Sequence, residues 1–349
     1  MKKLIIVSTR PGVGKGGIST ALEGYIAGLD AQNVAYEYVE SHWANSNTFK
    51  VWGLALFHII KLALKHRKNA VFWFHLGPWF SSFRKFTLAI VPRLLGASVI
   101  GHVHSPATKG YLENSFFTRK GYQLLLSPYH TIVALTPWWK NYLSAYFPNK
   151  SIVVCPNPNN EADIETAKGH LLSKDPYSAK TSVNVLTMAR LVEGKNVDKV
   201  IRSFNALPEH FSLTIAGDGE LSAELKQLVK QLGLAHRVTF TGWISGEQKS
   251  ALFHTADIFC LPSLYDSFGM VFIEAMANNV PVIALGWGPI IDVVIPETGE
   301  LVSEANEHEI SAALLQMSKH LEQYHLAGPK YVCEKYQPNI VVQEIIKLL

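Results

Sequence analysis

Short apolar runs alternate with segments of helical periodicity along the whole chain, and this pattern limits the fold more than any other feature. The runs expected as strands in the first half are Leu4–Ser8, Ala35–Val39, Ala70–His75, Val99–His104, Thr131–Leu135 and Ile152–Cys155. The helical segments between them include Ile18–Leu29, Phe49–Lys65 and Ser82–Leu94. Strands that alternate with helices favour βαβ units, so we expect an α/β protein with largely parallel sheets.

A second series of strands follows a break that is rich in proline and asparagine. The break is Pro156-Asn-Pro-Asn-Asn160 with a polar stretch to about Ser182, a composition typical of a linker. The strands expected after it are Val183–Met188, Leu213–Ala216, Val238–Thr241, Ile258–Leu261 and Pro281–Ala284. We therefore predict two doubly wound, Rossmann-like domains at 1–160 and 183–334, which face each other across a cleft and are joined by a linker at 161–182. A final helix at about 335–349 can pack back onto the first domain.

Composition excludes several classes of protein. Hydrophobic residues make up 48% of the chain and charged residues 17%, so wholesale disorder is excluded. Cys155, Cys260 and Cys333 lie far apart and form no C-x-x-C pattern, which argues against a disulfide scaffold or a structural zinc site. The first apolar run is too short for a signal peptide, and no run reaches the roughly 20 residues of a membrane span. We expect a cytoplasmic protein.

The charge is divided unequally between the two halves. Residues 1–160 carry 17 Lys and Arg against 5 Asp and Glu, and the remainder carries 15 against 23. A basic half suits nucleic acid, anionic lipid or a phosphate-bearing substrate, and its charge alone does not choose among them.

The first glycine-rich loop, between Arg10 and Thr20, follows a strand and opens a helix. Its glycines and the helix N-terminus favour an anion. Lys15 is followed by Gly16 and Gly17, so the loop fails the P-loop pattern, and it also fails G-x-G-x-x-G. A tight turn without a ligand, or a deviant P-loop ATPase, stays an alternative.

Two histidines lie at the end of a predicted buried strand. Strand alternation places His102 and His104 on one face, with His104 nearest the carboxyl end, where sites lie in such sheets. They could ligate a metal, but no third His, Cys or carboxylate lies nearby at ligand spacing, so no metal site is predicted. The alternative for His104 is a hydrogen-bonding residue of the core.

The second half carries cations and carboxylates after its strands. Arg190 and Lys195 follow the strand at Val183–Met188, where a guanidinium and an ammonium suit a diphosphate, although ordinary surface charges would look the same. A helix begins near Gly269, and its free N–H groups can bind a phosphate. Asp266 and Glu274 flank that start, so both carboxylates can face one cleft and accept hydrogen bonds from hydroxyls.

The order of these motifs resembles the retaining glycosyltransferases of family 4, which have the GT-B fold, over essentially the whole chain. The shared pieces are the Gly-Gly near the N-terminus, the strand-end His, Arg-Leu-x-x-x-Lys-Asn, the Ala-Gly-Asp-Gly turn and the Glu-x7-Glu region. Two departures matter. Asp266 replaces the first Glu and is one methylene shorter, and Ala189 replaces the usual Gly before the Arg.

The resemblance implies a role for each matching residue. Gly16 and Gly17 would lie beside the donor diphosphate and the acceptor, and His104 would contact the transferred sugar. Arg190 and Lys195 would neutralise the diphosphate. The other implied donor contacts are Asp266 for sugar hydroxyls, Ser267, Phe268, Gly269 and Met270 around the distal phosphate, Glu274 for the ribose, and Trp243 and Ile244 for the base.

The implied activity is transfer of a sugar from a UDP- or GDP-sugar, with retention, to a glycan or lipid-linked glycan of a capsule, O-antigen or lipopolysaccharide type. No permanent cofactor is expected, and the chain has no Asp-x-Asp, so no metal is required. The alternatives are a sugar-phosphate synthase or phosphorylase of the same fold and a catalytically inactive binding module. No nucleic-acid partner is expected.

Three basic and aromatic segments of the first half, at 49–68, 79–93 and 116–120, have two interpretations. In the first segment His58, Lys61, Lys65 and Lys68 form one stripe, opposite an apolar side that includes Trp52, Leu56, Ile59, Ile60 and Ala63. Arg84, Lys85 and Arg93 add basic character to the second segment. Such faces can lie on an anionic membrane, which would make the protein peripheral on the inner face of the cell membrane. Otherwise the basic face is simply solvated.

Overall fold

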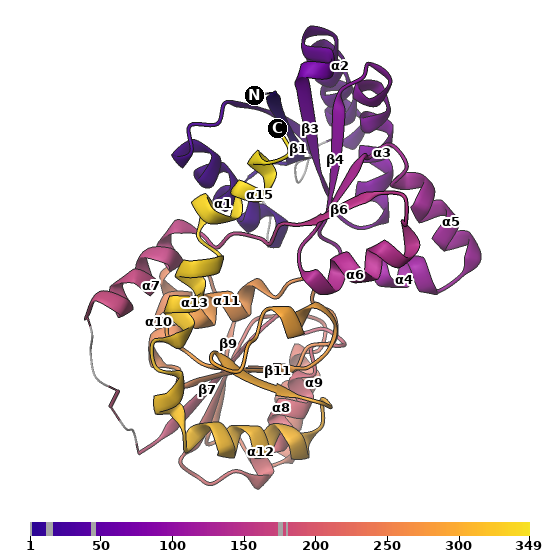
Figure 1. The fold of residues 1–349 in the computed structure, drawn as a ribbon. Helices are drawn as coiled ribbons and strands as arrows, with labels where there is room; N and C mark the ends of the chain where they lie inside the picture. Colours follow the sequence, from indigo (N-terminus) through magenta and orange to yellow (C-terminus); the bar gives the residue numbers. More distant parts are fainter. Residues whose placement is uncertain (1, 12–16, 43–46, 174–176, 179–180) are drawn as a thin grey trace. The chain divides into compact units, whose positions relative to one another are not determined.

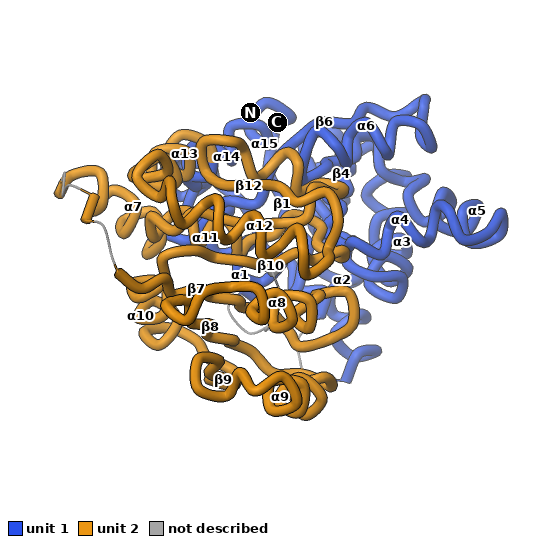
Figure 2. Tube along the Cα trace, turned by 90° about the horizontal axis from the view of Figure 1, so that it is seen from below, with its two compact units in different colours: residues 1–161, 336–349 blue, residues 162–335 orange. Residues whose placement is uncertain are grey.

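The computed structural model describes residues 2–11, 17–42, 47–173, 177–178 and 181–349. The chain divides into two units, which Figure 2 shows in different colours. Unit 1 comprises residues 1–161 and 336–349, and unit 2 comprises residues 162–335. Each is described here by itself.

Unit 1 contains a six-stranded parallel sheet in the order β2-β1-β3-β4-β5-β6. Its strands are β1 (Lys3–Thr9), β2 (Tyr36–His42), β3 (Ala70–Leu76), β4 (Ser98–Val103), β5 (Thr131–Ala134) and β6 (Ser151–Val154). All seven residues of β3 are buried, as expected for an interior strand with helices on both faces. The strand order reverses between β1 and β3, so ligand sites are expected at the carboxyl ends of these strands.

The helices of unit 1 begin at side-chain caps where the sequence provides them. They are α1 (Gly17–Ala31), α2 (Thr48–His66) with the 3-10 turn η1 (Arg67–Asn69), α3 (Trp79–Leu94), α4 (Thr108–Glu113), α5 (Phe116–Leu125) and α6 (Pro137–Tyr146). Asn47 accepts hydrogen bonds from the amides of Phe49 and Lys50, and Ser115 with Thr118 forms a capping box.

The C-terminal segment packs on the first helix of the chain. Helices α14 (Pro338–Val341) and α15 (Gln343–Ile346) are yellow in Figure 1, and Val341, Val342 and Ile345 join the core cluster around α1 and β1. Gly28 permits this packing, because a Cβ there would overlap the backbone of Pro338. The final segment therefore completes the core of unit 1.

Unit 2 contains a second six-stranded parallel sheet, in the order β12-β11-β10-β7-β8-β9. Its strands are β7 (Val183–Met188), β8 (Phe211–Ala216), β9 (Val238–Gly242), β10 (Ile258–Leu261), β11 (Val282–Leu285) and β12 (Gly299–Val302). Its helices are α7 (Glu161–Ser173), α8 (Val197–Ser203), α9 (Ser222–Gln231), α10 (Glu247–Thr255), α11 (Met270–Ala277), α12 (Glu307–Ser318) and α13 (Ala327–Lys335), with 3-10 turns η2 (Phe204–Ala206), η3 (Gly288–Asp292) and η4 (Leu321–Tyr324). The strand order reverses between β7 and β10, which is where a ligand site is expected.

The two parallel sheets confirm the predicted class of doubly wound α/β domains. Every predicted strand is present, and β12 is an additional one that is short and half-exposed. The stretch at 161–182 begins with a regular helix, α7, so the linker predicted there is not irregular in its first half. Among the described residues, no helix combines the length and the apolar character needed to cross a membrane.

Candidate functional site

Two loops meet at the carboxyl ends of β7 and β10, the switch point of unit 2. The turn after β7 contains Gly194 and Asn196, and the loop after β10 runs from Pro262 to Gly269. The amide of Leu264 donates to the carbonyl of Gly194 at 2.8 Å. The Nδ2 of Asn196 donates to the carbonyl of Pro262 at 2.7 Å. These two hydrogen bonds fix the loops against each other.

Lys195 and Asp266 form an ion pair across these loops. Lys195 Nζ lies 2.7 Å from Asp266 Oδ1 and donates to Ser263 Oγ at 3.1 Å. The side chains of Lys195 and Asp266 are only 14% and 18% exposed. The second carboxylate oxygen, Oδ2, is buried and has no hydrogen-bond partner among the residues that the structure describes. The predicted pair is therefore brought together, and one oxygen is left to accept a hydrogen bond from a ligand.

Arg190 lies on the same turn but does not join this pair. It is exposed, and among the described residues its guanidinium has no hydrogen bond or ion pair. The Ala-Gly-Asp-Gly turn positions its backbone, because Leu191 donates to the carbonyl of Asp218. A Cβ at Gly217 would overlap the carbonyl oxygen of Ala189, so this close approach requires glycine.

Glu274 has a partner that the sequence did not reveal. Lys249 Nζ, from α10, lies 2.6 Å from Glu274 Oε1, and the Glu274 side chain is only 8% exposed. The structure therefore gives each predicted carboxylate its own lysine, Lys195 for Asp266 and Lys249 for Glu274. Lys249 is separated from Glu274 by a strand and a loop, and no spacing in the chain indicates this contact.

The remaining donor residues predicted in unit 2 surround the start of α11 and the end of β9. Gly269 precedes α11 with φ of 78°, and Met270 is the first residue of that helix. Phe268 is buried, while Ser267 is half-buried. Trp243, 46% exposed, and the half-buried Ile244 directly follow β9.

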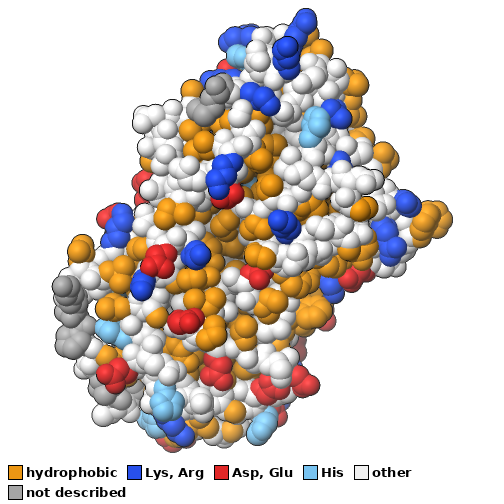
Figure 3. Space-filling model, in the orientation of Figure 1, with side chains coloured by type: hydrophobic (Ala, Val, Ile, Leu, Met, Phe, Trp, Pro, Cys, Tyr) orange, Lys and Arg blue, Asp and Glu red, His pale blue; other side chains and the backbone are white. Residues whose placement is uncertain are grey.

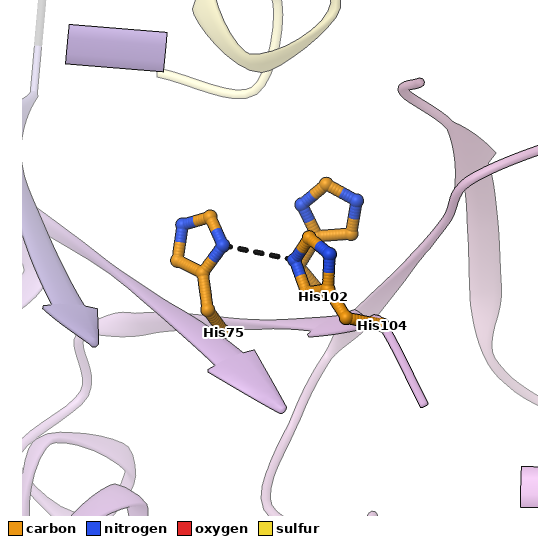
Figure 4. Close-up of side chains that lie close together, drawn as sticks. All are labelled: His75, His102 and His104. Carbon is orange, nitrogen blue, oxygen red and sulfur yellow. Dashed lines mark hydrogen bonds between the residues drawn. The ribbon is translucent and has the colours of Figure 1, made fainter. Parts of the chain in front are cut away.

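Unit 1 contains a cluster of three buried histidines at the carboxyl ends of β3 and β4 (Figure 4). His75 Nδ1 and His104 Nε2 lie 2.9 Å apart and share a hydrogen bond. His102 donates from Nε2 to the carbonyl of Cys155 at 3.2 Å. Burial lowers the pKa of all three, and the pKa of His104 falls to about 3. The three imidazoles are therefore neutral near pH 7.

His75 corrects one sequence-based statement, that no third histidine accompanies His102 and His104. It is the penultimate residue of the neighbouring strand β3 and stands opposite His102 in the parallel register. Ring nitrogens of the three lie within 4.8 Å of one another, close enough to consider a metal ion. Two of those nitrogens already share a hydrogen bond, and the positive charge of nearby Lys85 lowers the pKa of His75 and His104. Both facts disfavour a divalent cation.

The glycine loop can be placed only in part. Gly16 lies outside the described residues, while Gly17 begins α1, whose first turn carries no acidic side chain. The P-loop alternative depends mostly on residues of that loop and gains no support here.

Comparison with known proteins finds a family model that matches much of the second half of the chain. Residues 172–328 match the model of the family described as glycosyl transferases group 1. An uncharacterized glycosyltransferase of Methanocaldococcus jannaschii is 34% identical over 32% of this chain and 29% of its own length. One of Haemophilus influenzae is 26% identical over 64% of this chain and 62% of its own. A lipopolysaccharide core biosynthesis glycosyltransferase of Rhizobium meliloti is 27% identical over 40% and 45%. These alignments span less than two thirds of each relative.

The fold of this chain resembles those of several solved structures over its whole length. Anabaena HepE in complex with UDP has a TM-score of 0.69 at 15% identity and covers 100% of this chain and 99% of its own. Sucrose-phosphate synthase of Thermosynechococcus elongatus has a TM-score of 0.75 at 18% identity, covering 100% and 98%. The lipopolysaccharide outer core galactosyltransferase WaaB has a TM-score of 0.70 at 16% identity, covering 99% and 100%. Residues 172–328 match the glycosyl transferases group 1 family, and the fold of the chain is the two-domain GT-B fold.

Proposed function

We propose that this protein moves a sugar from a UDP- or GDP-sugar to a hydroxyl of a glycan or lipid-linked glycan. The observation that carries the proposal is the Lys195 ammonium, held 2.7 Å from Asp266 at the switch point of the second sheet. A cation fixed at the carboxyl ends of parallel strands suits a diphosphate. The similar Anabaena protein HepE has structures with UDP and with UDP-glucose, which supports this class of donor.

In this proposal the donor is bound by unit 2. Arg190 and Lys195 neutralise the diphosphate, and the amides of Gly269 and Met270 bind the distal phosphate at the start of α11. The free Oδ2 of Asp266 accepts from a hydroxyl of the sugar. The remaining donor contacts proposed are Ser267 and Phe268 beside the phosphate, Glu274 at the ribose, and Trp243 with Ile244 at the base.

We further propose a reaction that retains the anomeric configuration and requires no metal. The bond from the anomeric carbon to the phosphate oxygen breaks, the acceptor oxygen attacks from the same face, and the released phosphate takes the acceptor proton. Fixed cations stabilise the departing diphosphate more than the intact donor, so Arg190 and Lys195 lower the barrier. His104, neutral at pH 7, positions the transferred sugar by a hydrogen bond, with Gly16 and Gly17 beside the donor and acceptor.

Ligand binding and turnover test this proposal together. Thermal-shift titrations of the full chain with UDP, GDP, ADP and CMP should show stabilisation by one base in preference to the others. Lys195→Ala should abolish that stabilisation, whereas Lys199→Ala, an exposed lysine paired with Asp198 on α8, should not. If none of the nucleotides stabilises the wild-type protein, the donor site is wrong.

The pathway proposed is synthesis of a cell-surface polysaccharide of the lipopolysaccharide, capsule or O-antigen type. This pathway is supported by the similarity of the chain to the lipopolysaccharide core glycosyltransferase of Rhizobium meliloti and to the galactosyltransferase WaaB. A second candidate, a sugar-phosphate synthase, is favoured by the similarity to sucrose-phosphate synthase. Mass spectrometry of products with a free sugar phosphate as acceptor, beside a lipid-linked glycan, separates the two.

We also propose that unit 1 lies on an anionic membrane surface. The outer face of α2 is not simply polar, because Leu54, Phe57 and Leu64 are exposed there beside Lys61 and Lys65. The helix buries its other face through Val51, Ala55, Ile59, Leu62 and Ala63. A face that is both basic and apolar suits the interface of an anionic bilayer better than plain solvation.

Two further segments extend this basic and apolar character. Phe80 on α3 is 84% exposed, and Phe117 on α5, beside Arg119 and Lys120, is also 84% exposed. In Figure 3, blue and orange side chains adjoin at the upper end, where Figure 1 shows α2, and at the right edge, where it shows α5. Of the basic residues in 79–93, however, Lys85 is buried and belongs to the interior. Flotation with vesicles that contain anionic lipid tests the proposal, and absence of binding would remove it.

A further inference from the structure

Helix α3 places a lysine in the interior of unit 1 without a carboxylate partner. Lys85 is only 4% exposed, and its Nζ donates to Ser81 Oγ at 2.8 Å. Burial, followed by the nearby charge of Arg84, lowers the pKa of Lys85 to about 7. An ammonium removed from water is unfavourable unless an opposite charge compensates it.

Other nitrogen-bearing side chains converge on this lysine. Arg84 is half-buried, and within the described part of the chain its Nε has no hydrogen-bond partner. Lys85 and Arg84 lie near enough to His42, the last residue of β2, to lower its pKa. Lys85 likewise lowers the pKa of His75, the penultimate residue of β3, and of His104, which directly follows β4. The group therefore lies along the carboxyl ends of three strands of one sheet.

Two ring nitrogens in this group have no hydrogen-bond partner among the described residues. They are His42 Nδ1 and His75 Nε2, both buried. A neutral imidazole carries one N–H donor and one acceptor nitrogen, and rotation or a change of tautomer selects which one faces a ligand. Together with Arg84 and Lys85 they provide two positive charges and additional hydrogen-bond donors.

No acidic side chain of unit 1 compensates these charges. Residues 1–160 contain five acidic residues, and the segments 12–16 and 43–46 contain none. Glu23 is exposed on α1, and Asp30 accepts a hydrogen bond from Tyr36. Each of the others lies within ion-pair distance of a basic side chain: Glu37 of His66, Glu40 of Arg10, Glu113 of Lys109, and Glu344 of Lys347. Glu161, the last residue of the first segment of unit 1, is exposed. The buried cations thus face no counter-ion within their own unit.

We propose that Lys85, Arg84, His42 and His75 bind a phosphate group carried by the acceptor. This inference rests on the glycosyl transfer proposed above and names the class of its acceptor. Two cations with neutral imidazole donors match the two charges and several oxygens of a phosphate better than the single charge of a carboxylate. Because the donor diphosphate is assigned to unit 2, this anion belongs to the acceptor.

The same chemistry has two sources, a soluble sugar phosphate and the diphosphate of a lipid-linked glycan. Both offer phosphate oxygens to the same groups. The side chains therefore indicate a phosphate, and an experiment must identify the molecule to which it is attached. A soluble sugar phosphate would act without a membrane, whereas a lipid-linked diphosphate would be presented by detergent micelles or vesicles.

The test is a binding measurement on the full chain with Lys85→Met, which removes the charge and retains most of the side-chain length. Isothermal titration with inorganic phosphate, glucose 6-phosphate and farnesyl diphosphate should give dissociation constants at least about tenfold weaker than for the wild type. Lys140→Met, which removes an exposed lysine of α6, should leave them unchanged. Whichever of glucose 6-phosphate and farnesyl diphosphate binds the wild type more tightly indicates whether the acceptor phosphate belongs to a soluble sugar phosphate or to a lipid-linked glycan.

UDP binding, measured on the same samples, separates failure of this inference from failure of the proposed function. We expect Lys85→Met to retain the wild-type affinity for UDP and to lose affinity for inorganic phosphate. Equal phosphate affinity in wild type and Lys85→Met overturns the acceptor site and leaves the donor site standing. If Lys85→Met fails to fold, Arg84→Gln, a change of a half-exposed side chain, carries the same test. Tighter binding of glucuronate than of phosphate would also overturn the proposal.

Discussion

The polar groups of the two units are arranged in opposite ways. In unit 2 each carboxylate of the proposed donor site has its own lysine, Asp266 with Lys195 and Glu274 with Lys249. In unit 1 the buried Lys85 has only a serine hydroxyl, and the neighbouring imidazoles are neutral. Charges paired in advance are held in place before a ligand arrives, so they can act on it without reorganisation. A buried cation without a partner is instead completed by an anionic ligand.

This difference also explains why the two regions should respond differently to substitution. Removing one member of a buried ion pair leaves the other charge uncompensated and is costly. Removing an unpaired buried charge relieves the fold of a desolvated group. Loss of function should therefore accompany loss of stability in unit 2, whereas the two effects should separate in unit 1.

The largest effect is expected from Lys195→Ala. It removes a cation from the departing diphosphate and leaves Asp266 partly buried without its partner. Loss of one preorganised charge of this kind costs about 10² to 10³ in kcat. Steady-state kinetics of sugar transfer should show this loss, with Lys199→Ala as the matched control. A loss smaller than about threefold would contradict the role of Lys195 and the comparison built on it.

A smaller effect is expected from Lys249→Met. This change leaves the Glu274 carboxylate, 8% exposed, without its ion-pair partner and frees it to move from the ribose. We expect the donor KM to rise about tenfold while kcat changes little, since the ribose is remote from the bond that breaks. Glu274→Gln should give the same pattern. A fall in kcat without a change in KM would place Glu274 at the reacting bond instead.

The paired groups were predictable from the sequence only in part. Arg190, Lys195, Asp266 and Glu274 each follow a strand or open a helix, so their positions at the carboxyl edge follow from the α/β pattern. The partners are a different matter. Lys249 reaches Glu274 from another helix, and only the packing of α10 beside the sheet reveals it.

The same limit applies to unit 1. The strand pattern placed His104 at a functional edge, but the third histidine was missed because His75 lies on β3 and meets His102 only through the register of the sheet. Lys85 was assigned to the surface because one turn of α3 shows several basic residues. Which face of that helix is buried depends on its packing against β3 and β4, so the sequence could not distinguish Lys85 from the exposed Arg93.

The unpaired lysine predicts a dependence of stability on pH. The pKa of Lys85 is about 7 in the folded protein against 10.5 for the ordinary side chain. Between these values the unfolded chain binds more protons, so the free energy of unfolding should rise with pH. The rise from this one group is at most about 1.4 kcal/mol per pH unit. Urea unfolding at pH 7, 8.5 and 10 should show it in the wild type and not in Lys85→Met. His75, His102 and His104 are neutral in the folded protein and partly protonated in the unfolded chain near pH 7, so they add a smaller rise below about pH 8, which Lys85→Met retains.

The smallest effect is expected for membrane binding by the surface of unit 1. There, positive charges lie among exposed apolar side chains and not beside carboxylates. Lys61→Gln on α2 should weaken partition onto vesicles containing anionic lipid by about 1 kcal/mol, close to fivefold. A higher salt concentration should weaken vesicle binding by the wild type, because salt screens surface charge. It should also reduce the difference in binding between the wild type and Lys61→Gln. Phe57→Ser, which removes a side chain that is 70% exposed, should weaken binding at every salt concentration. If both variants bind as the wild type does, this face is solvated, and the unpaired charge that matters in unit 1 is the interior one at Lys85.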